Sequence, residues 1–524
     1  MGGKCRATGR SPVSIPSSAG PSSVPGSTIV DSLAYWATCQ PTRPFLCEGE
    51  QTFTYGEFYG LVGQCASTLE KQGFRYGDRI VLYLQRKSAY IAAYFAALSR
   101  GIIPVLIYPE RPASFVRFVV DAVAAKGVWT LDKWTGEGDC FSVIPWLDEA
   151  AGTAPDLANI RHPIAYLMFT SGTTRVPKAV MTTQQNVMAV TKTLIEQAGM
   201  PPGVREVIFM PLGSTGGLGH LHAVLMLGGT IVLLPWFMAA IGDPELRTLL
   251  AVIEREKIDG FLATPRLVRM LLADHRSELS ASAKNLRYML TNVSPLEREL
   301  IVDLLNLLPN LHFCTYYGLT EASRSIFNPC RRQPGYEHAT GFPVPGVELK
   351  LTAVDPHSQV GEVLLRGPNL FAGYWGEERQ SLVEDGWFST GDLGCMDEQG
   401  RLYVLGRKEE TINIDGLKFL PIQVESVLSQ HPAIQACAVV GLPDPLSYQR
   451  VGAAVQLRDP DASLEEKNHI ADAILAHCRD KLDSYQLPSK VHILPELPQT
   501  DLGKVKRGEL ISMLDSGLYS FPRP

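Results

Sequence analysis

Short apolar runs alternate with segments of helical period along the first two thirds of the chain, and glycine or proline separates many of them. Three strand–helix units are expected: strands 79–84 and 102–107 around helix 89–100, helix 243–257 with strand 260–264, and helix 295–307 with strand 313–317. Strands joined through helices are typically parallel and covered on both faces. The chain is therefore predicted to be an α/β protein with mostly parallel sheets flanked by helices.

The pattern changes beyond residue 355. Segments such as 361–367 and 400–406 are short strands bounded by glycine, which indicates a distorted β-barrel or a small antiparallel sheet. Helices 421–429 and 463–482 and strand 436–441 then indicate a compact α+β unit. At 524 residues the chain is long enough for several cores. We expect a disordered Ser/Pro/Gly-rich tail over 1–28, a large N-terminal domain over 29–408 and a small C-terminal domain over 409–524.

Charge and composition narrow the partners. A formal net charge of -6 argues against general binding to nucleic acid or to anionic membranes. Residues 224–241 are almost entirely apolar, but Gly228, Gly229 and Pro235 interrupt them, so a buried strand over 230–234 is expected in place of a membrane span. The ten cysteines have no metal-type spacing, which favours reduced thiols. A cytoplasmic small-molecule enzyme fits these features best.

One candidate phosphate loop follows the predicted strand 165–169. It is built from small hydroxyl residues, a glycine and a lysine: Thr170, Ser171, Gly172, Thr173, Thr174 and Lys178. Backbone N–H groups, hydroxyls and an ammonium can together surround a polyphosphate. The spacing of a Walker loop is absent. Taken alone, such a cluster is more often an ordinary turn.

Further candidates follow in the same order along the chain. They are the segment 316–321, which reads Tyr-Tyr-Gly-Leu-Thr-Glu, the Thr-Gly-Asp turn that ends at Asp392, Arg407, and the basic segment 497–507 around Lys504. An aromatic face can stack on a nucleobase, and a carboxylate is a ligand that Mg²⁺ accepts. Each motif alone is weak, but their order and spacing carry weight.

Together these five motifs resemble the adenylate-forming superfamily, which comprises acyl-CoA synthetases, peptide-synthetase adenylation domains and luciferases. The resemblance covers about residues 30–512 and is nearest to acyl- or aryl-acid CoA ligases. It implies a large N-terminal ATP- and acyl-binding domain and a mobile C-terminal domain. Arg175 and Ala179 replace family glycines, and Gln184 stands where acyl-CoA synthetases often have histidine.

By this resemblance the chain uses ATP and Mg²⁺ to convert a carboxylic acid to its acyl-AMP with release of pyrophosphate. Tyr317 is expected to stack on adenine, Asp392 and Arg407 to hold the ribose, and Glu321 to bind the metal. Thr320 is expected at the α-phosphate, and Lys504 to stabilise the charge that develops during adenylation. The nucleotide site is completed by the phosphate loop, Asn292, Tyr316 and Gly318.

The resemblance also implies a second step. Glu409 matches the family hinge about which the C-terminal domain rotates, and Gly416 and Lys418 would lie near the thiol of CoA or of an acyl-carrier protein's phosphopantetheine. Asn413 replaces a lysine that many relatives carry, so transfer to an amine stays open as an alternative. A non-catalytic nucleotide-binding relative is disfavoured, because the motif residues are intact.

The acyl pocket is expected beneath the nucleotide. The resemblance places Gly213, Ser214, Thr215, Gly216 and Val293 in its wall. Amino-acid adenylation domains carry an aspartate in this region to hold the α-ammonium, and none is present here. α-Amino acids are therefore disfavoured, whereas fatty, aryl and small branched acids all remain open. The sequence indicates no particular oligomeric state.

Overall fold

The computed structural model describes residues 28–130, 142–144, 161–169, 177–234, 242–292, 296–353, 359–377, 383–444, 447–500 and 505–515. Several sequence predictions lie outside these ranges: the tail up to residue 27, the phosphate-loop residues 170–174, Val293 and Lys504. The account below concerns the described residues.

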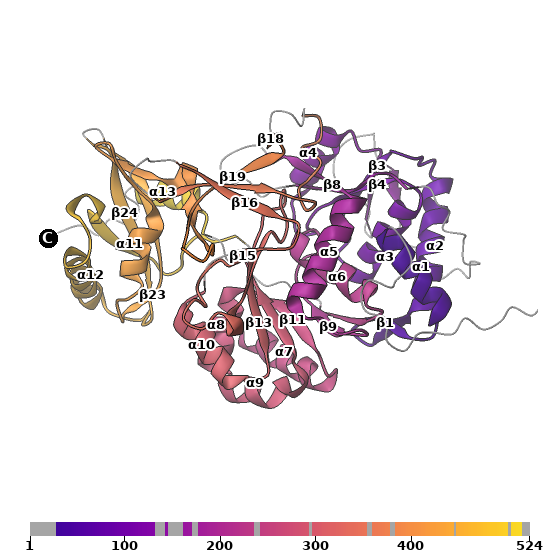
Figure 1. Cartoon of the computed structure of the whole chain (residues 1–524), viewed down its shortest axis with the longest axis horizontal. Coiled ribbons are helices and arrows are strands. Elements are labelled where there is room, and N and C mark those ends of the chain that lie inside the picture. The colour runs from indigo at the N-terminus through magenta and orange to yellow at the C-terminus, as the bar shows by residue number, and fades with distance from the viewer. Residues whose placement is uncertain are drawn as a thin grey trace, which may run out of the picture.

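A nine-stranded sheet forms the centre of the molecule, and its inner strands are parallel (Figure 1). Antiparallel strands complete both edges. In order across the sheet the strands are β15 (Phe342–Pro343), β14 (Ile326–Pro329), β13 (His312–Tyr317), β12 (Tyr288–Thr291), β11 (Gly260–Ala263), β9 (Arg205–Ile208), β10 (Thr230–Leu233), β1 (Pro44–Glu48) and β2 (Gln51–Thr54).

A six-stranded sheet lies beside it and is parallel except for its last pair. Its strands, in order, are β6 (Ser142–Ile144), β5 (Gly127–Trp129), β3 (Arg79–Leu82), β4 (Ile103–Leu106), β7 (Ile164–Phe169) and β8 (Ala179–Thr183). The strand–helix–strand unit predicted over 79–107 is present here, with helix α3 (Lys87–Ser99) between β3 and β4.

Helices α3 and α5 (Gln184–Ala198) contact both sheets and so form a middle layer. Every residue of α3 is buried, which explains its alanine-rich, unamphipathic sequence. The remaining helices of this part of the chain are α1 (Ile29–Cys39), α2 (Tyr55–Lys71), α4 (Ala113–Val123), α6 (Thr215–Met226), α7 (Asp243–Arg255), α8 (Pro265–Asp274), α9 (Arg276–Ser282) and α10 (Arg298–Leu307). Helix α6 is buried along almost its whole length and packs against α5 and α1.

The apolar stretch over 224–241 is divided between a helix and a strand, as predicted. Helix α6 ends at Met226, and β10 then pairs in parallel with both β1 and β9. Among the residues that the structure describes, none of the helices has the length and apolarity needed to cross a bilayer.

A third, antiparallel sheet follows, where the sequence predicted a distorted barrel. It contains β16 (Glu348–Ala353), β17 (Gly361–Arg366), β19 (Trp387–Met396), β18 (Val383–Glu384) and β20 (Leu402–Arg407). Its buried residues Val363, Leu365 and Leu402 belong to the same apolar core as the nine-stranded sheet.

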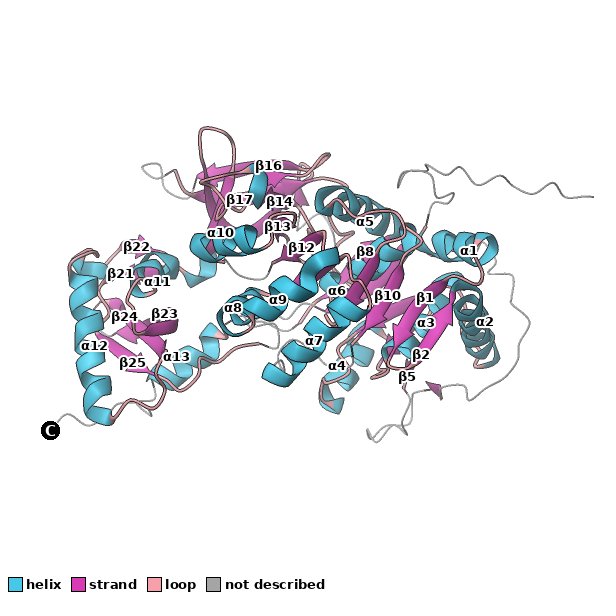
Figure 2. Ribbon diagram, turned by 90° about the horizontal axis from the view of Figure 1, so that it is seen from below, coloured by secondary structure: helices cyan, strands magenta, loops and turns pink. Residues whose placement is uncertain are grey.

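The C-terminal part has its own cores and lies at one end of the molecule (Figures 1 and 2). The three-residue helix η6 (Lys408–Glu410) leads into it. It contains the hairpin of β21 (Ile412–Ile414) and β22 (Leu417–Phe419), the sheet of β23 (Ile434–Asp444), β24 (Tyr448–Leu457) and β25 (Lys490–Ile493), and the helices α11 (Pro421–Leu428), α12 (Leu464–Arg479) and α13 (Arg507–Asp515). The predicted α/β fold class, with a smaller α+β unit at the C-terminus, is confirmed.

Candidate nucleotide and acyl site

Three motif residues meet where β13 ends beside the antiparallel sheet. The Tyr317 hydroxyl donates to Asp392 Oδ2 at 2.6 Å, and Arg407 Nε lies 3.0 Å from Asp392 Oδ1. Strands β19 and β20 place Asp392 directly opposite Arg407. Burial, and then the Asp392 carboxylate, raises the pKa of Tyr317 well above its ordinary value, so its hydroxyl stays a donor. Two donors therefore orient one carboxylate, which keeps lone pairs for a ligand's hydroxyl groups.

Tyr316 points away from Tyr317, because successive side chains of a strand face opposite sides. It is buried and stacks on Phe327, with ring centroids 5.2 Å apart. Its hydroxyl accepts a hydrogen bond of 2.8 Å from Asn292 Nδ2. The Asn292 Oδ1 is buried and has no hydrogen-bond partner among the described residues. A buried acceptor of this kind suits an exocyclic amino group such as that of adenine.

A tyrosine that the sequence analysis did not single out links the predicted metal ligand to the predicted phosphate lysine. The Tyr374 hydroxyl donates to Glu321 Oε1 at 2.8 Å, and Lys178 Nζ lies 4.7 Å from the centre of the Tyr374 ring. Lys178 also pairs with Glu377 at 2.8 Å, with both side chains about 40% exposed, so this pair is readily broken. An ammonium and an oriented carboxylate fit a polyphosphate with a divalent cation.

The segment 370–375 holds these groups in place because it adds to the edge of the six-stranded sheet. Met181 N donates to the Gly373 carbonyl, and Trp375 N donates to the Ala179 carbonyl, both at 2.9 Å. Phe371 N also donates to the Glu321 carbonyl at 2.8 Å. The site thus lies where strand β8, the loop after β13 and the segment before β18 meet.

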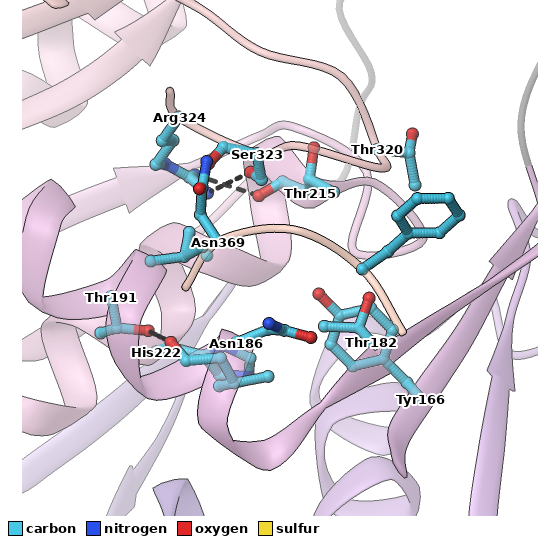
Figure 3. Close-up of a pocket in the computed structure, with 14 residues that line it drawn as sticks. Tyr166, Thr182, Asn186, Thr191, Thr215, His222, Thr320, Ser323, Arg324 and Asn369 are labelled. Carbon is cyan, nitrogen blue, oxygen red and sulfur yellow. Dashed lines mark hydrogen bonds between the residues drawn. The ribbon is translucent and has the colours of Figure 1, made fainter. Parts of the chain in front are cut away.

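A pocket opens beside these residues and holds about 400 Å³ of space, counted out to solvent. Figure 3 shows its wall, which combines aromatic rings with polar groups. The wall includes Tyr166, Thr182, Asn186, His222, Thr320 and Phe371. Burial, and then the neighbouring Arg324 charge, lowers the pKa of His222 to about 3, so this imidazole is neutral. Its Nε2 lies 3.0 Å from the Tyr94 hydroxyl, which orients the ring.

The structure separates the residues predicted for the acyl-pocket wall. Thr215 lines the pocket. Ser214 caps α6, its Oγ accepting from Gly217 N at 3.2 Å. Gly213 lies against the backbone of Ile107, where an added Cβ would approach to 2.8 Å, so this glycine serves close packing. An added Cβ at Gly216 would meet the Leu262 side chain at 3.1 Å.

The pocket or site residues that the sequence analysis missed include Tyr374, Asn186 and Arg324. Tyr374 and Glu321 are 53 positions apart, and no local pattern announces their contact. Asn186 occupies a helix-cap position, for which a cap is the ordinary reading. Arg324 did carry a signal, since it lies only three residues beyond the recognised segment 316–321.

The remaining candidates belong to the C-terminal part and to the helix η6 that leads into it. The segment that contains Lys504 is outside the described residues, but Gln499 and Val505 on either side of it form an antiparallel bridge. Glu409 lies in η6, between strand β20 of the antiparallel sheet and the hairpin of β21 and β22. Gly416 is in the hairpin turn with φ of 91°, and its N–H donates to Asn413 Oδ1 at 2.9 Å. Asn413 therefore shapes the turn that precedes the exposed Lys418.

Comparisons with known proteins agree with this geometry. The family model described as "AMP-binding enzyme" matches residues 33–375, and "AMP-binding enzyme C-terminal domain" matches residues 423–504. The chain belongs to the AMP-binding enzyme family, as the sequence resemblance predicted.

Among curated proteins, the chain is similar to feruloyl-CoA synthase of an Amycolatopsis species, with 28% identity over 90% of this chain and 96% of the relative. It is 31% identical to the chloroplastic/peroxisomal 2-succinylbenzoate–CoA ligase of Arabidopsis thaliana, over 88% of this chain and 92% of the relative. Among solved structures it resembles o-succinylbenzoate CoA synthetase from Bacillus subtilis bound to its acyl-adenylate intermediate, with 25% identity and a TM-score of 0.78 over 91% of this chain and 97% of that one.

Proposed function

We propose that the Tyr317–Asp392–Arg407 cluster holds the nucleoside of ATP and that Glu321, Tyr374 and Lys178 face its phosphates and Mg²⁺. As a member of the family, the chain is an AMP-forming acid–thiol ligase. The carboxylate of the acid attacks the α-phosphorus of ATP, an acyl-AMP forms and pyrophosphate leaves. Mg²⁺, when bound, neutralises phosphate charge. The observation that carries the proposal is the cluster at Asp392, whose carboxylate receives two charge-assisted hydrogen bonds, from Tyr317 and from Arg407.

Residue roles beyond this cluster are also proposed. Thr320 lines the pocket and is assigned to the α-phosphate, the remaining phosphate-loop residues and Gly318 to the phosphates, and Asn292 to adenine. Lys504 is assigned to the charge that passes between the acid, the α-phosphate and pyrophosphate. We place the boundary between the domains at residues 408 and 409, which lie between the core that includes Leu402 and the core that begins at Ile412.

Rotation about Glu409 is proposed to carry Lys504 away after adenylation and to bring Gly416 and Lys418 towards the thiol. The acceptor is CoA or the phosphopantetheine of a carrier protein. The enzyme is proposed to act in the cytoplasm. The acid is not an α-amino acid, since Ser214 and Thr215 stand at the start of α6 where an ammonium would need a carboxylate.

Acid-dependent exchange of labelled pyrophosphate into ATP tests the first step. Asp392→Ala removes the acceptor of both Tyr317 and Arg407 and is expected to lower kcat/KM for ATP by about 100-fold. Asp397→Ala serves as the matched control. It breaks another carboxylate–arginine pair, away from the site, in which the buried Arg401 has its Nε 2.6 Å from Asp397 Oδ2. Equal losses in the two variants would contradict the assignment of Asp392 to ATP.

A further inference from the structure

The most unusual charge in the pocket is the guanidinium of Arg324. Its side chain is 2% exposed and lines the pocket between the loop after β13 and the start of α6 (Figure 3). Its Nη2 donates to the Thr215 carbonyl at 3.0 Å, and its Nη1 donates to Ser323 Oγ at 3.3 Å. Nε is buried and has no hydrogen-bond partner among the described residues. The arginine therefore binds neutral oxygens and keeps an unused donor.

No carboxylate of the described residues lies within ion-pair distance of this guanidinium. Glu321, three positions earlier, receives its hydrogen bond from Tyr374 instead. A buried cation without a counter-charge is costly, so its retention in a pocket points to an anion supplied by a ligand.

The backbone and a glycine make room for this arginine. Arg324 has φ of 54°, a left-handed conformation that is strained for a residue with a long side chain. An added Cβ at Gly219 of α6 would lie 2.5 Å from two of the Arg324 guanidinium nitrogens. The helix thus leaves the space that the charged group fills. Strain and clearance at one position are typical of a site that is built for binding.

We infer that Arg324 binds a second carboxylate of the acid substrate, so that the enzyme prefers dicarboxylic acids. This inference rests on the proposed function and names the substrate class of the same site. Thr320, assigned to the α-phosphate, and Arg324 both line the pocket, and Figure 3 shows them separated along its upper edge. The carboxylate that reacts loses its charge when it becomes the mixed anhydride with AMP. A second carboxylate keeps its charge throughout, and a fixed guanidinium stabilises it in both states.

The test compares matched acids in pyrophosphate exchange with the full chain. Each pair consists of a dicarboxylic acid and its monomethyl ester, in one aliphatic and one aryl series, and simple monocarboxylic acids are included. The wild type is expected to favour the diacid in kcat/KM by about 30-fold or more in at least one series, as for the loss of one partner of a buried charge pair. Arg324→Met should abolish this preference and retain exchange with the ester.

Two variants make the result specific. Gly219→Ala displaces the guanidinium and should also reduce the diacid preference. Thr191→Val changes an uncharged pocket residue at nearly constant volume and should affect both acids alike. Arg324→Lys keeps the positive charge but loses the paired N–H donors of the guanidinium. This variant is expected to retain a weaker preference for diacids even where Arg324→Met fails to fold.

The outcomes separate the two proposals. Wild-type enzyme that uses esters or monocarboxylic acids as well as diacids contradicts the role of Arg324 while the proposed function stands. If Arg324→Met lowers kcat/KM for the diacid and for its monomethyl ester by the same factor, the role of Arg324 is likewise contradicted. Absence of exchange with every acid of the three classes contradicts the proposed function itself.

Discussion

Tyr374 stands between two groups of opposite charge, with its hydroxyl on Glu321 and its ring beneath Lys178. Partners that orient a metal-binding carboxylate typically contribute 10–100-fold to metal affinity. Tyr374→Phe removes the donor and keeps the ring, so the Mg²⁺ concentration for half-maximal pyrophosphate exchange should rise by about 10-fold or more. Tyr403→Phe, which loses a bond to Asp397 away from the site, is the control. An unchanged Mg²⁺ requirement would remove Tyr374 from the positioning of Glu321.

His222 makes a pH-dependent prediction at the same scale. Its pKa is about 3 in the folded chain, against about 6.5 when unfolded, so the unfolded chain binds the extra proton between these values. The contribution of the neutral His222 to the free energy of unfolding is complete above pH 6.5. It is lost as the pH falls towards 3, at up to about 1.4 kcal/mol per pH unit. His222→Asn should therefore lose less stability than the wild type between pH 7 and pH 5, as measured by thermal unfolding.

The control for this measurement is His469→Asn, at an exposed position of α12. Its pH dependence of unfolding should follow that of the wild type. If His222→Asn follows it as well, the buried imidazole does not stay neutral in the folded chain.

Helix α5 is tied to the site through its first turn. Asn186 Oδ1 accepts from Thr183 N at 3.0 Å, while Nδ2 donates to the Pro368 and Leu370 carbonyls at 2.7 and 2.8 Å. One amide thus caps the helix and holds the segment before Phe371. Asn186→Ala is expected to cost about 2–3 kcal/mol, because it removes a cap and leaves buried carbonyls without donors.

Unfolding measurements on Thr54→Ala supply the comparison. Thr54 caps α2 by accepting from Glu57 N at 3.2 Å, away from the pocket. This variant should lose only about 1 kcal/mol and keep its KM for the acid, whereas Asn186→Ala should raise it. Equal effects of the two substitutions would show that Asn186 acts as a cap alone.

The success of the sequence analysis at the level of elements has a physical reason. Strands β3 and β4 and helix α3 follow one another along the chain, and periodicity with Gly101 as a stop predicts such local structure. The site required contacts between distant segments. The order of the motifs suggested that Tyr317 and Asp392 belong to one site. The contact of Tyr374 with Glu321 and the packing of Gly213 on Ile107 depend instead on how the sheets and loops meet, and no local pattern encodes this.

At the scale of the whole molecule, the proposed rotation about Glu409 can be blocked. Proline fixes φ near −65° and removes the freedom on which a hinge depends. Glu409→Pro should keep pyrophosphate exchange and lower thioester formation by at least about tenfold, with Glu409→Ala close to the wild type in both assays. Equal loss of both half-reactions in the proline variant would argue that no rearrangement separates them.

The sheet of the C-terminal part is covered on both of its faces. Val439, Val451 and Val455 pack with α11 and α12, whereas alternate residues such as Val440 and Leu442 pack with α13. A layer that is closed on each side needs no apolar surface from the larger part of the protein. If the proposed boundary holds, we expect that the enzyme can be cut between 408 and 411 into two separately synthesised polypeptides, and that a part from a relative can be joined to this one without rebuilding either interior.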